Sequence, residues 1–167
     1  MMMNAQSLES QILDTRQPIV LVVDDDREAL LALRRALRSD AYNLLSTDDP
    51  FQALEWVKGG TIDLVITDEF MPAMLGTELL EAIRRTSPDT ATVLLTGYPK
   101  PAVMFRGFQQ RVDLLLAKPW EDQALRDSAL RLLREHAPQF LGRKAAEQAV
   151  SGHPVEKPRC VDEPESP

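Results

Sequence analysis

Short apolar runs alternate with amphipathic stretches along most of the chain. Five of these runs have the length of strands, and a run that is apolar throughout is typical of a strand covered on both faces. They lie at residues 19–23, 42–46, 62–67, 91–95 and 112–116. The alternation predicts an α/β fold with a five-stranded parallel sheet and helices on both of its faces.

Five amphipathic stretches separate and follow the predicted strands. We predict helices at 27–38, 50–58, 76–85, 102–109 and 121–136. Asp26 precedes the first helix and is placed to cap it with a side-chain oxygen. Pro50 suits the first turn of the second helix, and the Gly59-Gly60 pair ends it.

Length and composition divide the chain into one domain and two tails. Its 167 residues suit a single compact domain and are too few for two full domains. Residues 1–17 are polar without a strong period, and we predict a flexible N-terminal arm. Residues 138–167 are Pro-rich and have too little apolar surface to offset their ordering entropy, so we predict a disordered tail. The domain itself is predicted to span 18–137.

Composition and charge exclude several classes of partner. Hydrophobic residues make up 44% of the chain, which is enough for a core, and the net charge is −7 without a dense Lys/Arg block. Nucleic acids and anionic membranes both require concentrated positive charge, so neither is an expected partner. Cys160 is the only cysteine, which excludes a disulfide within the chain. With no signal-like start and no apolar run of membrane-spanning length, we expect a cytoplasmic protein.

The residues that follow the predicted strands are the chemically informative ones. Asp24 and Asp25 follow the first strand, Asp68 the third, Thr96 the fourth and Lys118 the fifth. Parallel strands end at a common edge, where such sheets gather their functional residues. Crowded carboxylates resist ionising unless a cation lies between them, and oxygen ligands suit Mg²⁺. With a hydroxyl and an ammonium nearby, the pattern predicts metal-assisted transfer of a phosphoryl group to a carboxylate.

Each of these residues also has an ordinary structural explanation when taken alone. Asp24 and its acidic neighbours could serve only as a favourable helix N-terminus. Asp68 could cap a loop, and Lys118 could be a solvated surface residue. Their joint placement at the ends of the right strands favours a functional site.

Four motifs, in this order, resemble the response-regulator receiver domain of two-component signalling. They are LVVDDD, LVITDEFMPAMLGTELL, VLLTGY and LLAKPW, and the similarity covers roughly 18–137. The second motif is the most specific, because it combines Asp68, Met71-Pro72 and Gly76 at the family's spacing. The resemblance implies the (βα)5 flavodoxin-like receiver fold. Because no output-domain pattern follows the fifth strand and helix, we expect a stand-alone receiver.

The resemblance implies a phosphoacceptor and a metal site. Asp68 would accept the phosphoryl group, with Mg²⁺ as the cofactor. Asp25 would bind the metal directly and Asp24 through water. Asp68 itself and the main-chain oxygen of Phe70 would complete the ligands that the protein supplies.

The resemblance also implies two residues that bind the phosphoryl group. Thr96 would be the switch hydroxyl, and Lys118 would be the cation that pairs with the phosphoryl oxygens. The family usually holds the bond before Pro119 in cis.

Three positions depart from the family's usual pattern. Leu115 stands where many receivers carry a switching Tyr or Phe, so the usual aromatic readout of phosphorylation is in doubt. Leu75 replaces an acidic or polar residue that is common before Gly76. Phe70 is bulkier than the small or polar residue that usually stands two positions after the acceptor.

We therefore expect a phosphoacceptor response regulator of a two-component phosphorelay, without enzymatic activity beyond slow self-dephosphorylation. Its expected partners are a histidine kinase or phosphotransfer protein and an unknown downstream protein, with a second copy of the chain as a candidate. One alternative is an interaction module on the same fold that is never phosphorylated. The other is a phosphatase of the haloacid dehalogenase type. Asp24-Asp25-Asp26 fits the Asp-x-Asp start of that class, but Glu28 stands where it requires Thr or Val.

Overall fold

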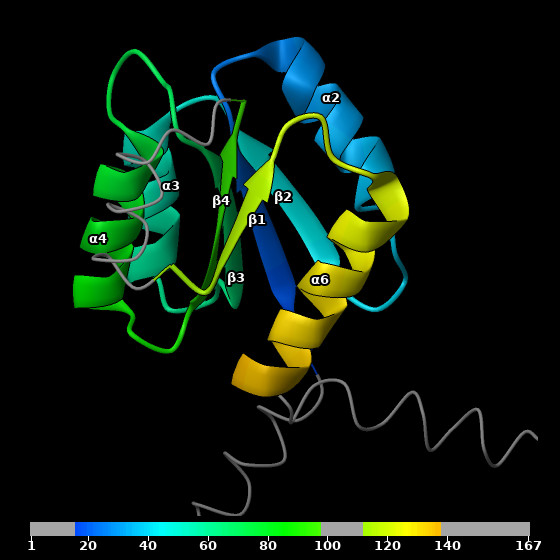
Figure 1. The fold of residues 1–167 in the computed structure, drawn as a ribbon. Coiled ribbons are helices and arrows are strands. Elements are labelled where there is room, and N and C mark those ends of the chain that lie inside the picture. Colours follow the sequence, from blue (N-terminus) through cyan, green and yellow to red (C-terminus); the bar gives the residue numbers. More distant parts are fainter. Residues whose placement is uncertain (1–15, 98–111, 138–167) are drawn as a thin grey trace, which may run out of the picture.

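The computed structural model describes residues 16–97 and 112–137, which form five strands and four helices (Figure 1). The strands are β1 (Ile19–Val23), β2 (Asn43–Thr47), β3 (Leu64–Asp68), β4 (Ala91–Thr96) and β5 (Leu114–Ala117). The helices are α2 (Arg27–Ala36), α3 (Pro50–Lys58), α4 (Gly76–Thr86) and α6 (Asp122–His136). The predicted helix at 102–109, almost all of the predicted arm and the tail at 138–167 lie outside the described residues.

The five strands form one parallel sheet in the order β2-β1-β3-β4-β5. Figure 1 shows α2 and α6 on one face of this sheet and α3 and α4 on the other. The predicted fold class, a five-stranded parallel sheet with helices on both faces, is therefore confirmed. No helix in the described ranges is long and apolar enough to cross a membrane.

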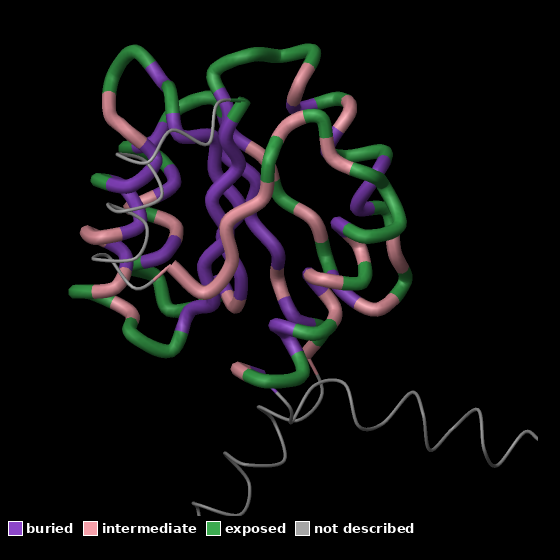
Figure 2. Tube along the Cα trace, in the orientation of Figure 1, coloured by how far each residue is buried: buried purple, intermediate pink, exposed green. Residues whose placement is uncertain are grey.

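Alternate residues of the strands feed two separate cores. On β1, Val20 and Val22 pack in the core beneath α2 and α6, whereas Leu21 and Val23 pack in the core beneath α3 and α4. All four side chains have no exposed surface. Figure 2 shows the same concentration of buried residues along the central strands. The uniformly apolar run at the start of the domain follows from this burial on both faces.

Aspartate side chains cap the two helices that follow β1 and β2. Asp26 caps α2, with its side chain accepting from the amide of Glu28 at 2.9 Å, as predicted. Asp49 caps α3 by accepting from the amide of Phe51 at 2.8 Å, and Pro50 lies in the first turn.

β3 and β5 both begin two residues later than the apolar pattern predicted, each after an aspartate. Asp63 accepts a hydrogen bond from the amide of Ile19 at 2.8 Å and pairs with the guanidinium of Arg16. Asp113 accepts from the amide and the hydroxyl of Thr92, each at 2.8 Å. In both cases the aspartate side chain accepts a hydrogen bond from a backbone amide of the neighbouring strand. Regular backbone pairing between the strands therefore starts only after the aspartate.

β2 is shifted by one residue relative to the prediction, from 42–46 to 43–47. Tyr42 is buried, and its hydroxyl donates to the carbonyl of Leu37 at the end of α2. This burial raises the pKa of Tyr42 to about 12. Tyr42 therefore packs in the core between the sheet and α2, and β2 begins one residue later, at Asn43.

Candidate functional site

The parallel register brings four polar residues to one edge of the sheet. Asp68 ends β3 and is paired with the residue before Thr96, and Thr96 ends β4 and is paired with the residue before Lys118. Asp24 follows β1, which pairs with β3 on its other side. The edge that the sequence predicted is thus formed by the ends of β1, β3, β4 and β5.

Lys118 joins two carboxylates from different strands. Its Nζ lies 2.8 Å from Oδ2 of Asp24 and 2.7 Å from Oδ1 of Asp68. The side chain of Lys118 is 24% exposed, whereas those of its two partners are 2% and 10% exposed, in that order. The peptide bond between Lys118 and Pro119 is cis, as the resemblance implied.

Burial and pairing act in opposite directions on these groups. The pKa of Asp24 lies above its ordinary value of 3.8, because burial raises it more than the Lys118 ammonium and the Asp26 amide lower it. The pKa of Lys118 lies above its ordinary value of 10.5. Burial lowers it, but the hydrogen bonds and charges of Asp24 and Asp68 together outweigh that burial. The Lys118 ammonium is therefore charged at neutral pH. Burial makes the ionised form of Asp24 less favourable than it would be in water.

Both oxygens of Asp68 have a partner. Oδ1 meets the Lys118 ammonium, and Oδ2 accepts from the backbone amide of Phe70 at 2.8 Å. The residue is only 7% exposed. Two bonds from different directions fix the plane of this carboxylate at the end of β3.

The glycine of the second motif is required by a close approach to Asp68. A Cβ on Gly76 would lie 2.1 Å from the backbone oxygen of Asp68 and 2.9 Å from Cδ1 of Leu94. No side chain fits there, so only glycine lets the start of α4 pack directly against the peptide of the candidate phosphoacceptor. This contact explains why Asp68 and Gly76 occur together in the sequence.

Thr96 lies at the same edge and is fully buried. Its main-chain oxygen accepts from the amide of Lys118 at 2.8 Å, which ties the end of β4 to the start of the segment after β5. The two residues that were predicted to bind the phosphoryl group are thus held side by side through their backbones.

One predicted ligand of the metal stands apart from this cluster, and another joins it through its backbone amide. Asp25 is exposed, and within the described ranges its carboxylate makes no hydrogen bond or ion pair. The amide of Phe70, the residue whose main-chain oxygen is the other predicted ligand, donates to Oδ2 of Asp68 at 2.8 Å. The described residues contain no group of three or more His, Cys, Asp and Glu arranged to hold a metal ion.

The charges of the edge nevertheless fit a divalent cation. Asp24, Asp25 and Asp68 supply three carboxylates, and the Lys118 ammonium pairs with two of them, Asp24 and Asp68. Two negative charges remain, on oxygen ligands that suit Mg²⁺.

A buried residue next to the site that the sequence did not reveal is Glu69, immediately after Asp68. It is fully buried, and its carboxylate accepts from the amide of Thr77 at 2.9 Å and from the Thr77 hydroxyl at 3.3 Å. Leu75 occupies the N-cap of α4 and has no side-chain acceptor. The absence of an acceptor at Leu75 was the signal that could have pointed to a cap from elsewhere.

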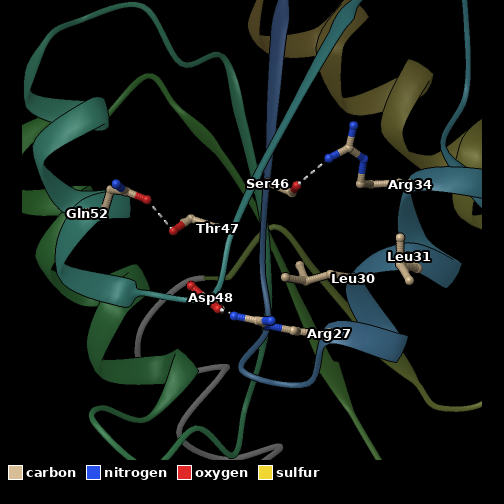
Figure 3. A pocket seen from close by; sticks show the side chains of 8 residues that line it. All are labelled: Arg27, Leu30, Leu31, Arg34, Ser46, Thr47, Asp48 and Gln52. Carbon is tan, nitrogen blue, oxygen red and sulfur yellow. Dashed lines mark hydrogen bonds and ion pairs between the residues drawn. The ribbon is translucent and has the colours of Figure 1, made fainter.

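A pocket of about 350 Å³ lies between α2 and the segment from β2 to α3 (Figure 3). Arg34 donates to the hydroxyl of Ser46 at one end, and Arg27 lies 3.8 Å from Asp48 at the other. Leu30 lies between these two pairs. The pocket includes none of the acidic residues joined by Lys118, so it is separate from the candidate site.

Comparison with protein families places most of the chain in one group. The profile of the response regulator receiver domain matches residues 20–130. The response regulator MprA of Mycobacterium sp. strain KMS is 31% identical over 119 residues, which are 71% of this chain and 52% of that protein. The chain therefore spans about half the length of the curated relatives that it matches.

Solved structures agree with this similarity. The receiver domain of an HD domain-containing protein from Pseudomonas fluorescens Pf-5 has 30% identity and a TM-score of 0.69, over 80% of this chain and 95% of that one. The chemotaxis protein CheY4 of Vibrio cholerae has 27% identity and a TM-score of 0.65, over 70% of this chain and 99% of that one. Both of those structures are matched over nearly their whole length.

Proposed function

Because this chain belongs to the response regulator receiver domain family, we propose that it accepts a phosphoryl group on Asp68 in a two-component phosphorelay. The observation that carries this proposal is the Lys118 ammonium between the carboxylates of Asp24 and Asp68, at 2.8 and 2.7 Å. A carboxylate held beside a fixed cation at the end of a buried strand is suited to accept a group that brings further negative charge.

The proposed reaction uses Asp68 as the nucleophile. One of its oxygens attacks the phosphorus, a phosphorus–oxygen bond forms, and the bond from phosphorus to the donor's nitrogen breaks. The donor would be a histidine kinase or a phosphotransfer protein, whose imidazole leaves as a neutral ring after taking up a proton. Lys118 would then pair with the new phosphoryl oxygens, and the Thr96 hydroxyl would bond them.

The residues present fit Mg²⁺ as the cofactor. Asp25 and Asp68 would hold the ion directly, Asp24 would do so through water, and the main-chain oxygen of Phe70 would complete the set. The bound ion would neutralise charge that develops on the phosphoryl group. The exposed carboxylate of Asp25 is available for this role, since it has no partner among the described residues.

The product would act through protein contacts rather than catalysis. A phosphorylated receiver of this kind would bind a downstream protein or a second copy of the chain, and would lose the phosphoryl group slowly by its own hydrolysis. Nothing basic enough for nucleic acid or an anionic membrane stands out in a chain of net charge −7.

The test is incubation with acetyl phosphate and Mg²⁺, followed by intact-mass measurement. We expect one phosphoryl group on the parent and none on Asp68→Asn. Asp26→Asn is the matched control. It removes an exposed carboxylate from the same edge, keeps a good N-cap for α2, and should be labelled like the parent.

The same experiment decides between the alternatives. Rapid turnover of a generic phosphatase substrate without a stable label would favour a phosphatase of the haloacid dehalogenase type. A folded parent that shows neither label nor turnover, with acetyl phosphate or with a histidine phosphotransfer donor, would favour an interaction module that is never phosphorylated.

A further inference from the structure

We propose that Glu69 is a positioning residue for the phosphoacceptor: its buried carboxylate caps α4 and so holds the loop that orients Asp68. This inference rests on the proposed function of Asp68 and deepens it. It names a residue outside the set of acceptor, metal ligands and phosphoryl-binding groups. Four contacts around the β3–α4 loop carry it.

The first contact replaces a missing cap. A helix leaves its first amides without partners inside the helix, and a polar side chain at the N-cap usually binds one of them. Leu75 holds the N-cap of α4 and supplies no acceptor. Glu69, six residues before Leu75, supplies the acceptor instead. Its carboxylate accepts from both the amide and the hydroxyl of Thr77.

The second and third contacts close the loop between Glu69 and α4. The Gly76 amide donates to the main-chain oxygen of Glu69 at 2.9 Å, and Phe70 pairs with Leu75 in an isolated antiparallel bridge. The side chain and the main chain of Glu69 therefore both bind the first turn of α4. The residues between them form a loop with a fixed base.

The fourth contact connects this loop to the carboxylate of Asp68. The Phe70 amide, at the base of the loop, donates to Oδ2 of Asp68 at 2.8 Å. The position of this amide is set on one side by Glu69 and on the other by the bridge to Leu75. Removing the cap would let α4 start later, loosen the bridge and shift the amide that orients the Asp68 carboxylate.

Glu69 is a carboxylate in a buried position, where an apolar side chain would be the usual choice. The residue has no exposed surface, and a buried carboxylate is unfavourable unless it is well hydrogen-bonded. An apolar side chain would fill the same space without desolvating a charge. A carboxylate next to the acceptor is consistent with the need for two acceptor oxygens at the start of α4.

The test uses four variants of the full chain. Glu69→Ala removes the cap, and Glu69→Ala with Leu75→Asp supplies a new one at the N-cap, whose backbone is extended as a capping residue requires. Glu69→Gln keeps one acceptor oxygen for the two donors of Thr77, in case the alanine variant does not fold. Glu78→Gln is the matched control, because it removes an exposed charge from the first turn of the same helix and keeps a side-chain oxygen for the Leu75 amide, which Glu78 binds at 3.0 Å.

Two readouts are taken at a temperature where each variant is fully folded. They are the initial rate of Asp68 labelling by acetyl phosphate with Mg²⁺, and the protection of the Phe70 amide from hydrogen exchange, measured by NMR without Mg²⁺. We expect Glu69→Ala to slow labelling about tenfold, as displacement of a reacting group does. It should also lower the protection of the Phe70 amide, because the hydrogen bond of this amide to Asp68 loosens. Glu69→Gln should lie between the parent and Glu69→Ala, Glu78→Gln should match the parent, and Leu75→Asp should restore most of both properties.

A folded Glu69→Ala or Glu69→Gln variant with the parent's labelling rate and the parent's protection of the Phe70 amide would overturn the inference. So would a loss that Leu75→Asp leaves unrepaired, because the cap would then not be the cause. If the parent itself takes no label, the proposed function fails, whereas the Phe70 amide still decides whether Glu69 positions this loop.

Discussion

Lys118 pairs with two aspartates at the end of the sheet, and these two differ in their other hydrogen bonds. Asp24 is 1% exposed and bonds both the ammonium and the Asp26 amide, while Asp68 meets the ammonium with one oxygen and the Phe70 amide with the other. One cation thus serves two carboxylates. At the scale of single residues, the site keeps a surplus of negative charge whose burial opposes folding.

This surplus predicts that Asp24→Asn stabilises the metal-free protein. The asparagine keeps an oxygen for the Asp26 amide and removes a buried charge, while Asp68 still pairs with Lys118. We expect the free energy of unfolding at neutral pH, measured by urea in EDTA, to rise by about 1 kcal/mol. Asp25→Asn, which removes the exposed neighbour, should change it by less than about 0.5 kcal/mol.

The gain from Asp24→Asn should depend on pH. The pKa of Asp24 is raised by burial, so its contribution to stability is fully present below 3.8, the ordinary value, and is lost as the pH rises through the raised value. The gain in unfolding free energy of Asp24→Asn over the parent should therefore be largest at neutral pH and shrink as the pH falls toward 3.8. A difference that grows toward acid pH would show that Asp24 is stabilised as an anion.

At the scale of elements, the start of α4 packs closely against the end of β3. α4 starts so near the end of β3 that Gly76 and the Asp68 peptide touch, and the intervening loop is closed by Glu69 and by the bridge from Phe70 to Leu75. Any movement of α4 is therefore transmitted to the backbone of the candidate phosphoacceptor.

Gly76→Ala should consequently damage both stability and labelling. Its Cβ would lie 2.1 Å from the Asp68 oxygen, so α4 must move away. We expect a loss of about 3 kcal/mol in unfolding free energy and slower phosphorylation of the folded fraction. Gly97→Ala is the control, since a Cβ there meets no atom of the described residues within 4 Å and should be tolerated. Equal unfolding free energies for the two variants would contradict the close approach.

The sequence predicted the elements well where burial alone decides them. β1, buried on both faces, has the predicted bounds, and the cap at Asp26 was read correctly. The starts of β3 and β5 were predicted too early, because Asp63 and Asp113 bond the neighbouring strand through side chains. Apolar periodicity carries no information on such side-chain bonds.

The site was predictable to the extent that strand ends fix it. Asp24, Asp68 and Lys118 meet because the parallel register brings them together, and the register follows from the order of the strands. Glu69 was not predictable, because an acidic residue at the start of a loop is normally solvated. Asp25 follows Asp24 in the sequence, but it faces solvent and takes no part in the cluster.

At the scale of the whole domain, one core packs on each face of the sheet, and the candidate site lies at the carboxyl edge of its strands. The functional groups there come from residues as far apart as Asp24 and Lys118, 94 positions along the chain. A ligand that binds this edge therefore links strands from both halves of the domain. Its binding energy should appear in the stability of the whole fold.

Mg²⁺ should accordingly stabilise the entire domain. At about a hundred times its Kd, a ligand that binds only the folded state adds about 2.7 kcal/mol to the unfolding free energy. We expect Mg²⁺ to raise the thermal midpoint of the parent and of Asp26→Asn alike. Asp25→Asn should lose most of this shift. An equal shift in Asp25→Asn would place the ion elsewhere.

The central claim, that Asp68 is the phosphoacceptor, is tested most directly by locating the phosphoryl group on the unaltered protein. The chain is labelled with acetyl phosphate and Mg²⁺, and borohydride then reduces an aspartyl phosphate to homoserine. Peptide mass mapping identifies the residue that has changed. We expect homoserine at position 68 alone, with Asp24 and Asp25 unaltered. Homoserine at another aspartate, or phosphate on a hydroxyl or imidazole with position 68 intact, would contradict the account.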